Sequence, residues 1–163
     1  MRSIIVKLEP YEIEMASQVA NKRYIENIKM KKKFGHGYKG SEQKTLSLGI
    51  LGAMGEVAYC KAKNVFFNGS YTDTYSRYDK ADVGKDIEIR TQERKNNNTL
   101  IIRPSEKKAK YVLVTFDGNH SYTIHGWFPF ITKLEDKYLT DFGLDRPKCW
   151  SIPIKDLYNI NDI

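Results

Sequence analysis

Residues 80–92, KADVGKDIEIRTQ, bring several acidic and basic side chains into one short stretch of the chain. Residues 86–92 alternate as a β-strand does, so successive side chains should point to opposite faces. The apolar face would carry Ile87, Ile89 and Thr91. The polar face would carry Asp86, Glu88, Arg90 and Gln92. We expect the polar face to line a cleft; the simpler interpretation is a Glu88–Arg90 ion pair on a half-exposed sheet, worth at most about 1 kcal/mol.

Asp82 and Glu56 extend this group of acids. A magnesium ion prefers oxygen ligands, binds one or two carboxylates and completes its shell with water and substrate phosphate. Asp82 would begin one strand, Glu88 would lie on the next, and Glu56 would come from a helix packed over them. We therefore expect these three acids to hold Mg²⁺, with Mn²⁺ as a substitute.

The same residues resemble the PD-(D/E)XK nuclease superfamily, also called restriction endonuclease-like. The resemblance covers residues 49–127 and rests on the segments GILGAMGEVAY, ADVG, IEIRT, LIIRP, YVLV and YTIHGW, which are similar to those of a group of small phage-encoded proteins. It implies a restriction endonuclease-like core in which Asp82 and Glu88 are the metal carboxylates and Glu56 is the helix acid. It also implies hydrolysis of phosphodiester bonds, with DNA as the substrate.

Two features depart from the superfamily pattern. No P-D dipeptide occurs, and Asp86 competes with Asp82 as the first acid, although the D-x-G context and the wider separation from Glu88 favour Asp82. Arg90 stands where most members have lysine. Arginine cannot act as a general base because its pKa exceeds about 12, but it can hold the scissile phosphate. Activation of the attacking water would fall to the metal, and Gln92 would either orient that water or be an ordinary surface residue.

The chain is basic, with 27 Lys and Arg against 20 Asp and Glu in 163 residues and a formal charge of +7. This excess favours a polyanionic partner, here DNA, although a basic surface can also serve solubility alone. The glycines and lysines of residues 31–39, KKKFGHGYK, predict a basic loop. Its nucleic-acid-binding side chains would be Lys31, Lys32, Lys33, His36 and Lys39. A solvated loop without a partner is the alternative.

The pattern of apolar residues predicts one α+β domain over residues 1–163, with a central mixed sheet flanked by helices. Helices are expected at 10–30 and 41–62, and short ones at 134–139 and 155–158. Strands are expected at 3–8, 65–67, 86–92, 100–103, 111–116 and 122–128, the last four as a largely antiparallel meander. Gly49, Gly52 and Gly55 inside the second helix suggest that one helix face approaches the sheet closely.

Other residues carry weaker signals. Cys60 and Cys149 lie far apart and outside any CxxC unit, which indicates a reducing compartment and neither a disulfide framework nor a zinc site. No apolar run approaches the roughly 20 residues of a membrane span, so we expect a cytoplasmic protein without a membrane partner, in the host cytoplasm if phage-encoded. His120 and His125 match no catalytic or metal spacing and are expected to be structural. A homo-oligomer is neither indicated nor excluded.

Taken together, these features favour a magnesium-dependent deoxyribonuclease in which a carboxylate-bound magnesium activates water and Arg90 clamps the phosphate. The alternative is a catalytically inactive nucleic-acid-binding or interaction module that retains the nuclease fold. Arg90 in place of lysine is the best support for that alternative.

Overall fold

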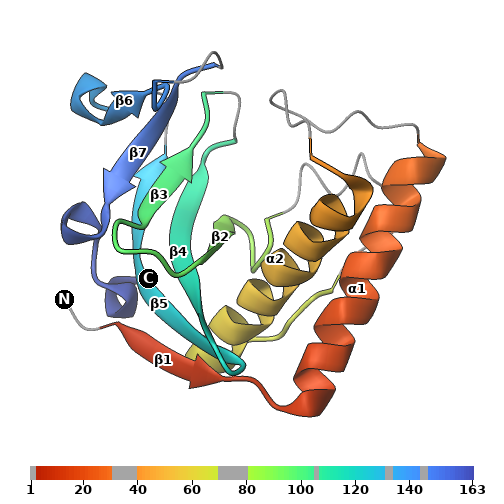
Figure 1. Cartoon of the computed structure of the whole chain (residues 1–163). Coiled ribbons are helices and arrows are strands. Elements are labelled where there is room, and N and C mark those ends of the chain that lie inside the picture. Colours follow the sequence, from red (N-terminus) through yellow and green to blue (C-terminus); the bar gives the residue numbers. More distant parts are fainter. Residues whose placement is uncertain (1–2, 31–39, 70–80, 105–106, 131–133, 144–146) are drawn as a thin grey trace.

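The computed structural model describes residues 3–30, 40–69, 81–104, 107–130, 134–143 and 147–163. It is α+β, with two long helices and two sheets in three layers. Figure 1 shows α1 and α2 on one face of the larger sheet, with the smaller sheet on its other side. The expected class is therefore confirmed, but both helices lie on the same face of the sheet.

Both long helices have the end signals that their sequences require. Helix α1 (Pro10–Lys29) begins with a capping box between Glu9 and Glu12 and has proline in its first turn. Helix α2 (Glu42–Lys63) is capped by Ser41, whose hydroxyl accepts from the Lys44 N–H at 3.2 Å. It ends at Asn64 in a left-handed conformation. The helices expected at 10–30 and 41–62 from the apolar pattern are therefore confirmed, each within one residue at either end.

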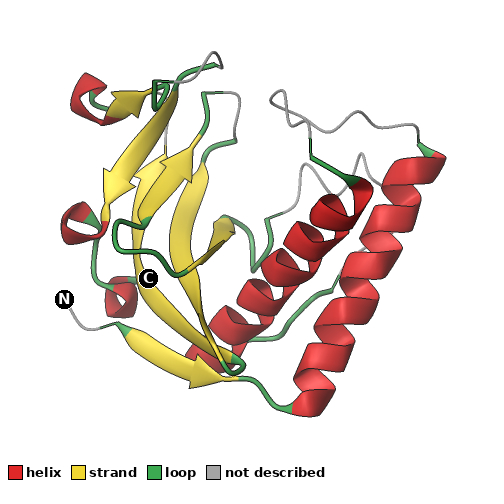
Figure 2. Cartoon of the chain, in the orientation of Figure 1, coloured by secondary structure: helices red, strands yellow, loops and turns green. Residues whose placement is uncertain are grey.

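The larger sheet contains β1 (Ile4–Lys7), β5 (Ser121–Phe130), β4 (Ala109–Gly118) and β2 (Ile87–Glu93), in that order. Strand β2 runs parallel to β4, whereas the other pairs are antiparallel. The smaller sheet has the order β3 (Thr99–Ile102), β7 (Cys149–Pro153) and β6 (Leu139–Thr140). Figure 2 shows the strands of both sheets in yellow on the side of the molecule away from the two long helices.

The predicted antiparallel meander is confirmed for its last two strands, because β4 pairs antiparallel with β5, but it is wrong for β2 and β3. Strand β3 does not belong to the larger sheet, because it pairs with β7 in the smaller one. After β3 the chain re-enters the larger sheet as β4, which lies parallel to β2. Alternating residues determine which faces a strand buries, but they do not determine which strand lies beside it. Strand β4 is buried on both faces, because Val112 and Val114 face the helices while Tyr111 and Leu113 face the smaller sheet.

Three smaller predictions also differ from the structure. Residues 65–67 form no strand. The helix expected at 134–139 is a single 3₁₀ turn, Asp136–Tyr138, which leads into β6. The helix expected at 155–158 is a 3₁₀ turn at Ile154–Asp156. Short segments of this length carry too few periodic residues to separate a helix from a turn.

Gly55 brings helix α2 against strand β2. A Cβ atom at this position would overlap the Thr91 side chain on β2, whereas one at Gly49 or Gly52 would meet nothing within 4 Å. Only one of the three helix glycines is thus required for close packing. This contact packs α2, which carries the neighbouring Glu56, directly against β2, which carries Glu88.

Candidate functional site

Successive side chains of strand β2 point to its two opposite faces, as the sequence alternation predicts. Ile89 packs in the core under the helices, and Thr91 faces Gly55 of α2. Glu88 and Arg90 point to the opposite face, where Arg90 lies over the Tyr111 ring at 4.9 Å. Glu88 is 7% exposed, so the polar face is buried at this point. A carboxylate this deeply buried requires cationic or hydrogen-bonding partners.

Asp82 lies along the outer edge of β2. The preceding segment forms an isolated antiparallel bridge between Val83 and Ile87. Asp82 Oδ2 accepts a hydrogen bond from the Ile89 N–H at 2.8 Å. The backbone of the edge strand therefore holds Asp82, and the charge of Asp82 acts on both Glu88 and Glu56.

Glu56 is held by Arg23 of helix α1. The guanidinium donates to both carboxylate oxygens, at 2.7 Å and 2.9 Å. The side chains are 20% and 8% exposed, so this bidentate pair is largely buried. The sequence reasoning missed Arg23, because 33 residues separate it from Glu56 and no motif joins them. The only available signal was general: a glutamate on a buried helix face needs a cation from a neighbouring element.

Burial and the charge of Asp82 together raise the pKa values of both glutamates. Burial raises the pKa of Glu56 to about 7, the charge of Asp82 adds to this effect, and the Arg23 hydrogen bond opposes it. Burial also raises the pKa of Glu88, again with a contribution from Asp82. The charge of Asp82 thus acts on both glutamates.

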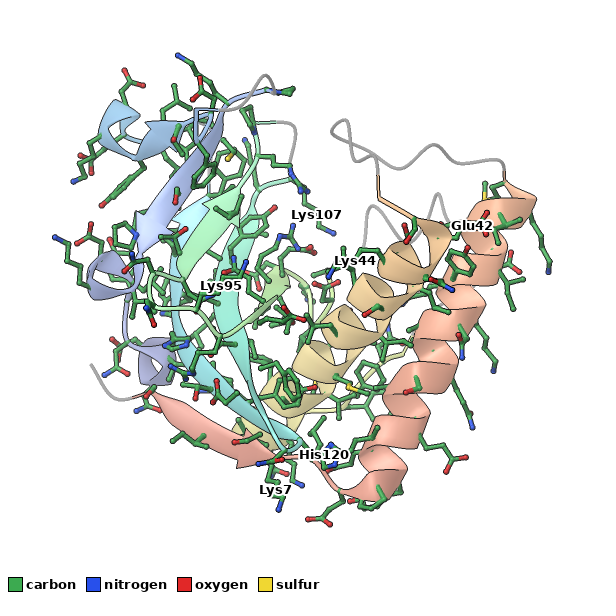
Figure 3. The ribbon with its side chains drawn as sticks, viewed as in Figure 1. Lys7, Glu42, Lys44, Lys95, Lys107 and His120 are labelled. Atoms are coloured by element: carbon green, nitrogen blue, oxygen red, sulfur yellow. The ribbon has the colours of Figure 1, made fainter. Side chains whose placement is uncertain are left out.

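Glu88 has two cationic neighbours. Lys107 Nζ lies 2.8 Å from Oε1, and an Arg90 guanidinium nitrogen lies 3.5 Å from Oε2. Arg90 is also held by the Ile89 carbonyl at 3.3 Å and by the Tyr111 ring. Lys107 precedes β4, and Figure 3 shows it between the sheets and the start of α2 in this view. Lys107 is the second cationic partner of these acids that sequence reasoning missed.

Other predicted site residues lie apart from the three acids. The Gln92 amide donates to the Thr99 carbonyl at 2.8 Å and accepts from Asn98 at 2.9 Å, within the turn between β2 and β3. Asp86, the competing first acid, has a 52% exposed side chain and pairs with Lys110 at 3.1 Å. The predicted nucleic-acid-binding residues Lys31, Lys32, Lys33, His36 and Lys39 lie outside the described residues.

His125 belongs to a separate polar network on the larger sheet. Its Nε2 lies 2.9 Å from Thr115 Oγ1, and this hydroxyl donates to Asp117 at 3.0 Å. Thr123 and Arg94 also donate to Asp117. Burial lowers the pKa of His125, which favours the neutral imidazole. These contacts are those of a satisfied histidine in a sheet, which agrees with the structural role expected from sequence.

The donor set suits a hard divalent cation in its chemistry, since all three acids offer carboxylate oxygens. Across the described ranges, no three His, Cys, Asp or Glu side chains are already arranged as a set of metal ligands. Arg23 binds both oxygens of Glu56, whereas Asp82 has only Oδ2 engaged by a backbone N–H. Magnesium needs only one or two protein carboxylates in general, so Asp82 and Glu88 remain the candidates among these acids.

No protein family, curated protein or solved structure matches this chain. Neither α1 nor α2, the long helices in the described part of the chain, is apolar enough to cross a bilayer. Function is therefore inferred from the geometry of the acidic cluster and from the charges around it.

Proposed function

We propose that the protein is a metal-dependent nuclease that hydrolyses phosphodiester bonds in DNA. One observation carries the proposal: Glu56 and Glu88 are buried carboxylates on neighbouring elements, each held by cationic side chains, and the charge of Asp82 acts on both. Buried carboxylates with raised pKa values and specific charged partners are common at functional sites. The resemblance of these same residues to the PD-(D/E)XK pattern supports the same function.

Each side chain has a role in this proposal. Asp82 and Glu88 would hold Mg²⁺, which supplies Lewis acidity and lowers the pKa of water. Glu56, kept in place by Arg23, would complete the negative field around the cation. Arg90 would bind the scissile phosphate and stabilise the charge that develops on it. Tyr111 supports Arg90 in that position through its ring.

A cleavage screen tests the proposal. Linear, circular, single-stranded and branched DNA would each be incubated with Mg²⁺ or Mn²⁺ and either wild type or Glu88→Gln. We expect metal-dependent cleavage by wild type and a loss of about 10²-fold or more in Glu88→Gln, comparable with removal of a transition-state charge donor. Asp86→Asn is the matched control, because this exposed acid in the same segment pairs with Lys110. Equal loss in both variants would contradict the proposal, as would metal-independent cleavage.

A non-catalytic nucleic-acid-binding module is the second candidate. It is favoured by the ion pairs of Arg23 with Glu56 and of Lys107 and Arg90 with Glu88, which already neutralise much of the acidic charge. The same screen separates the two candidates. A folded wild-type protein that binds DNA but cleaves none of the substrates with either metal would favour the binding module.

A further inference from the structure

We infer that the phosphate backbone of DNA binds to the end of the larger sheet at which β2 and β4 begin. Three lysines form this surface, which we call the basic end: Lys85, Lys108 and Lys110. The inference rests on DNA as the partner in the proposed function. It adds the place where the backbone lies and the way in which it is held, by contacts between lysine and phosphate that involve no metal ion.

The parallel pairing of β2 with β4 brings two separate basic segments together. Lys85 lies just before β2, and Lys108 lies just before β4. Ile87 is opposite Lys110 in the register of the two strands, and the Lys110 N–H donates to the Asp86 carbonyl at 2.7 Å. An antiparallel pairing would place the starts of the two strands at opposite ends of the sheet. The basic end is therefore a product of the tertiary structure, which no local motif predicts.

The positive charge of the basic end is only partly offset. The segments GKD and KKAK, which contain its three lysines, hold four lysines in all and one acid, Asp86. Lys85 and Lys108 are exposed, and the Lys110 side chain is 40% exposed although it pairs with Asp86 at 3.1 Å. An exposed ion pair of this kind contributes little to stability, so Lys110 can exchange Asp86 for a phosphate. Clustered charges of one sign attract a polyanion, and lysine–phosphate contacts gain further from the release of counterions.

The basic end adjoins the candidate acids. Glu88 follows Lys85 by three residues, so their Cα atoms lie at most about 11 Å apart. Lys107 precedes Lys108 directly, and its Nζ lies 2.8 Å from Glu88 Oε1. Each strand of DNA carries one phosphate per about 3.4 Å of helix axis. A backbone held at the basic end therefore brings a phosphodiester bond near Glu88 within about three nucleotides of the lysine contacts.

The experiment measures the binding of a short labelled DNA duplex by fluorescence anisotropy, without divalent metal and between about 50 and 200 mM salt. The test variant replaces Lys85, Lys108 and Lys110 by glutamine. Each lost phosphate contact reduces the slope of log K against log salt by about 0.9, so the variant should lose about 2.7 of the wild-type slope. Its affinity at the lowest salt should fall about tenfold or more. Lys85→Gln combined with Lys108→Gln, both outside the strands, serves as a second variant if the triple variant unfolds below the temperature of the measurement.

Two further measurements test how the backbone is held. Lysine contacts to phosphate carry no sequence information, so two duplexes of equal length and different sequence should lose the same factor in affinity. Asp86→Asn removes the acid that offsets the basic end, so it should bind duplex about threefold more tightly than wild type. A loss confined to one of the two duplex sequences would overturn binding through phosphate, and unchanged or weaker binding by Asp86→Asn would count against a backbone at this end.

The matched control removes the same charge from other parts of the molecule. Its three lysines, replaced by glutamine, come from β1 and from the two 3₁₀ turns near β6 and β7: Lys7, Lys137 and Lys155. Strand β1 lies at the opposite edge of the larger sheet from β2, and Figure 3 shows Lys7 at the end of the molecule away from Lys107. Lys137 pairs with the exposed Glu135 at 2.9 Å, as Lys110 does with Asp86. The control should keep the wild-type slope.

The outcomes separate the basic end from the proposed function. If wild type cleaves DNA with Mg²⁺ but the test variant and the control have equal slopes and equal affinities, the basic end is overturned and the nuclease proposal stands. If the slope falls in the test variant alone and wild type cleaves no DNA, the basic end is supported and the binding module replaces the nuclease. If wild type binds no duplex at about 50 mM salt, both are overturned. Cleavage by wild type together with a reduced slope in the test variant alone supports both.

Discussion

Arg23 of helix α1 holds both carboxylate oxygens of Glu56 on helix α2, at 2.7 Å and 2.9 Å. Neither residue belongs to the sheet, yet the pair stands beside Asp82, whose charge acts on both of its members. The first helix thus contributes directly to the electrostatics of the candidate site as well as to the core.

Removal of Arg23 should destabilise the protein strongly. Arg23→Met leaves Glu56 buried without its bidentate partner, which we expect to lower the free energy of unfolding by about 3 kcal/mol at neutral pH. Arg23→Met combined with Glu56→Leu should recover much of that loss, since no buried charge is then left unpaired. Urea denaturation of the four proteins measures both effects. A double variant no more stable than Arg23→Met would contradict the pairing.

The raised pKa of Glu56 makes stability depend on pH. Its pKa is about 7 in the folded protein and near 4.5 when unfolded, so between these values the folded state binds more protons. Stability must therefore fall as pH rises from about 4.5 to 7 and then level off, with roughly 3 kcal/mol at most from this residue. Glu88 contributes in the same direction, while the lowered pKa of His125 acts in the opposite one.

The difference between wild type and Glu56→Gln isolates this contribution. The free energy of unfolding, measured by urea denaturation from pH 4.5 to 8, should fall less steeply with pH in Glu56→Gln. Asp86→Asn, which removes an exposed acid, serves as the control and should keep the wild-type slope. Parallel curves for wild type and Glu56→Gln would show that Glu56 has an ordinary pKa.

Alanine at Gly55 should separate helix α2 from strand β2. The added Cβ overlaps the short, branched side chain of Thr91, so helix or strand must shift at a cost of about 1–3 kcal/mol. Gly52→Ala in the same helix meets nothing within 4 Å and should stabilise the protein by about 1 kcal/mol. Thermal melts distinguish the two variants. Recovery of stability on adding Thr91→Ala to Gly55→Ala would identify the contact, and equal effects of the two glycine variants would refute it.

DNA binding without metal should depend steeply on salt. A chain with a formal charge of +7 that contacts several phosphates releases counterions, so affinity should fall about tenfold or more between about 50 and 200 mM salt. Replacing Lys31, Lys32 and Lys33 by alanine should reduce the slope of log K against log salt by up to about 3. The charge-matched control replaces Lys137, Lys148 and Lys155, which are exposed residues of the C-terminal part. Salt-independent binding would argue against a nucleic-acid partner.

Arg90 separates the two candidate functions. If Arg90 clamps the phosphate, Arg90→Ala should lose about 10²-fold or more in cleavage rate, while Arg90→Lys should keep measurable activity. If the protein is a binding module, wild type should not cleave and Arg90→Lys is the variant that could gain activity. Rates at equal protein and metal concentration decide between them. Unchanged cleavage in Arg90→Ala would leave Arg90 with only a structural role beside Glu88 and Tyr111.

Local features of the sequence were sufficient for the long elements and for the faces of β2. Capping residues and periodic apolar residues determine α1 and α2, because each depends on neighbours within one or two turns. The alternation in β2 places Glu88 and Arg90 opposite Ile89 and Thr91 in the same way. The sequence also indicates that β4 is covered on both faces, because the continuous apolar run YVLVTF is typical of a strand buried on both faces.

The sequence did not determine the partners of these elements. The parallel pairing of β2 with β4 depends on the sheet to which β3, the strand between them in sequence, belongs. Strand β3 pairs with β7, which lies near the other end of the sequence. The contacts of Arg23 with Glu56 and of Lys107 with Glu88 likewise join elements that no motif connects. Candidate acids can be recognised locally because their residue type and spacing are visible in the sequence. Their cations are selected only when packing removes water from the carboxylates and leaves one neighbouring side chain able to reach each of them.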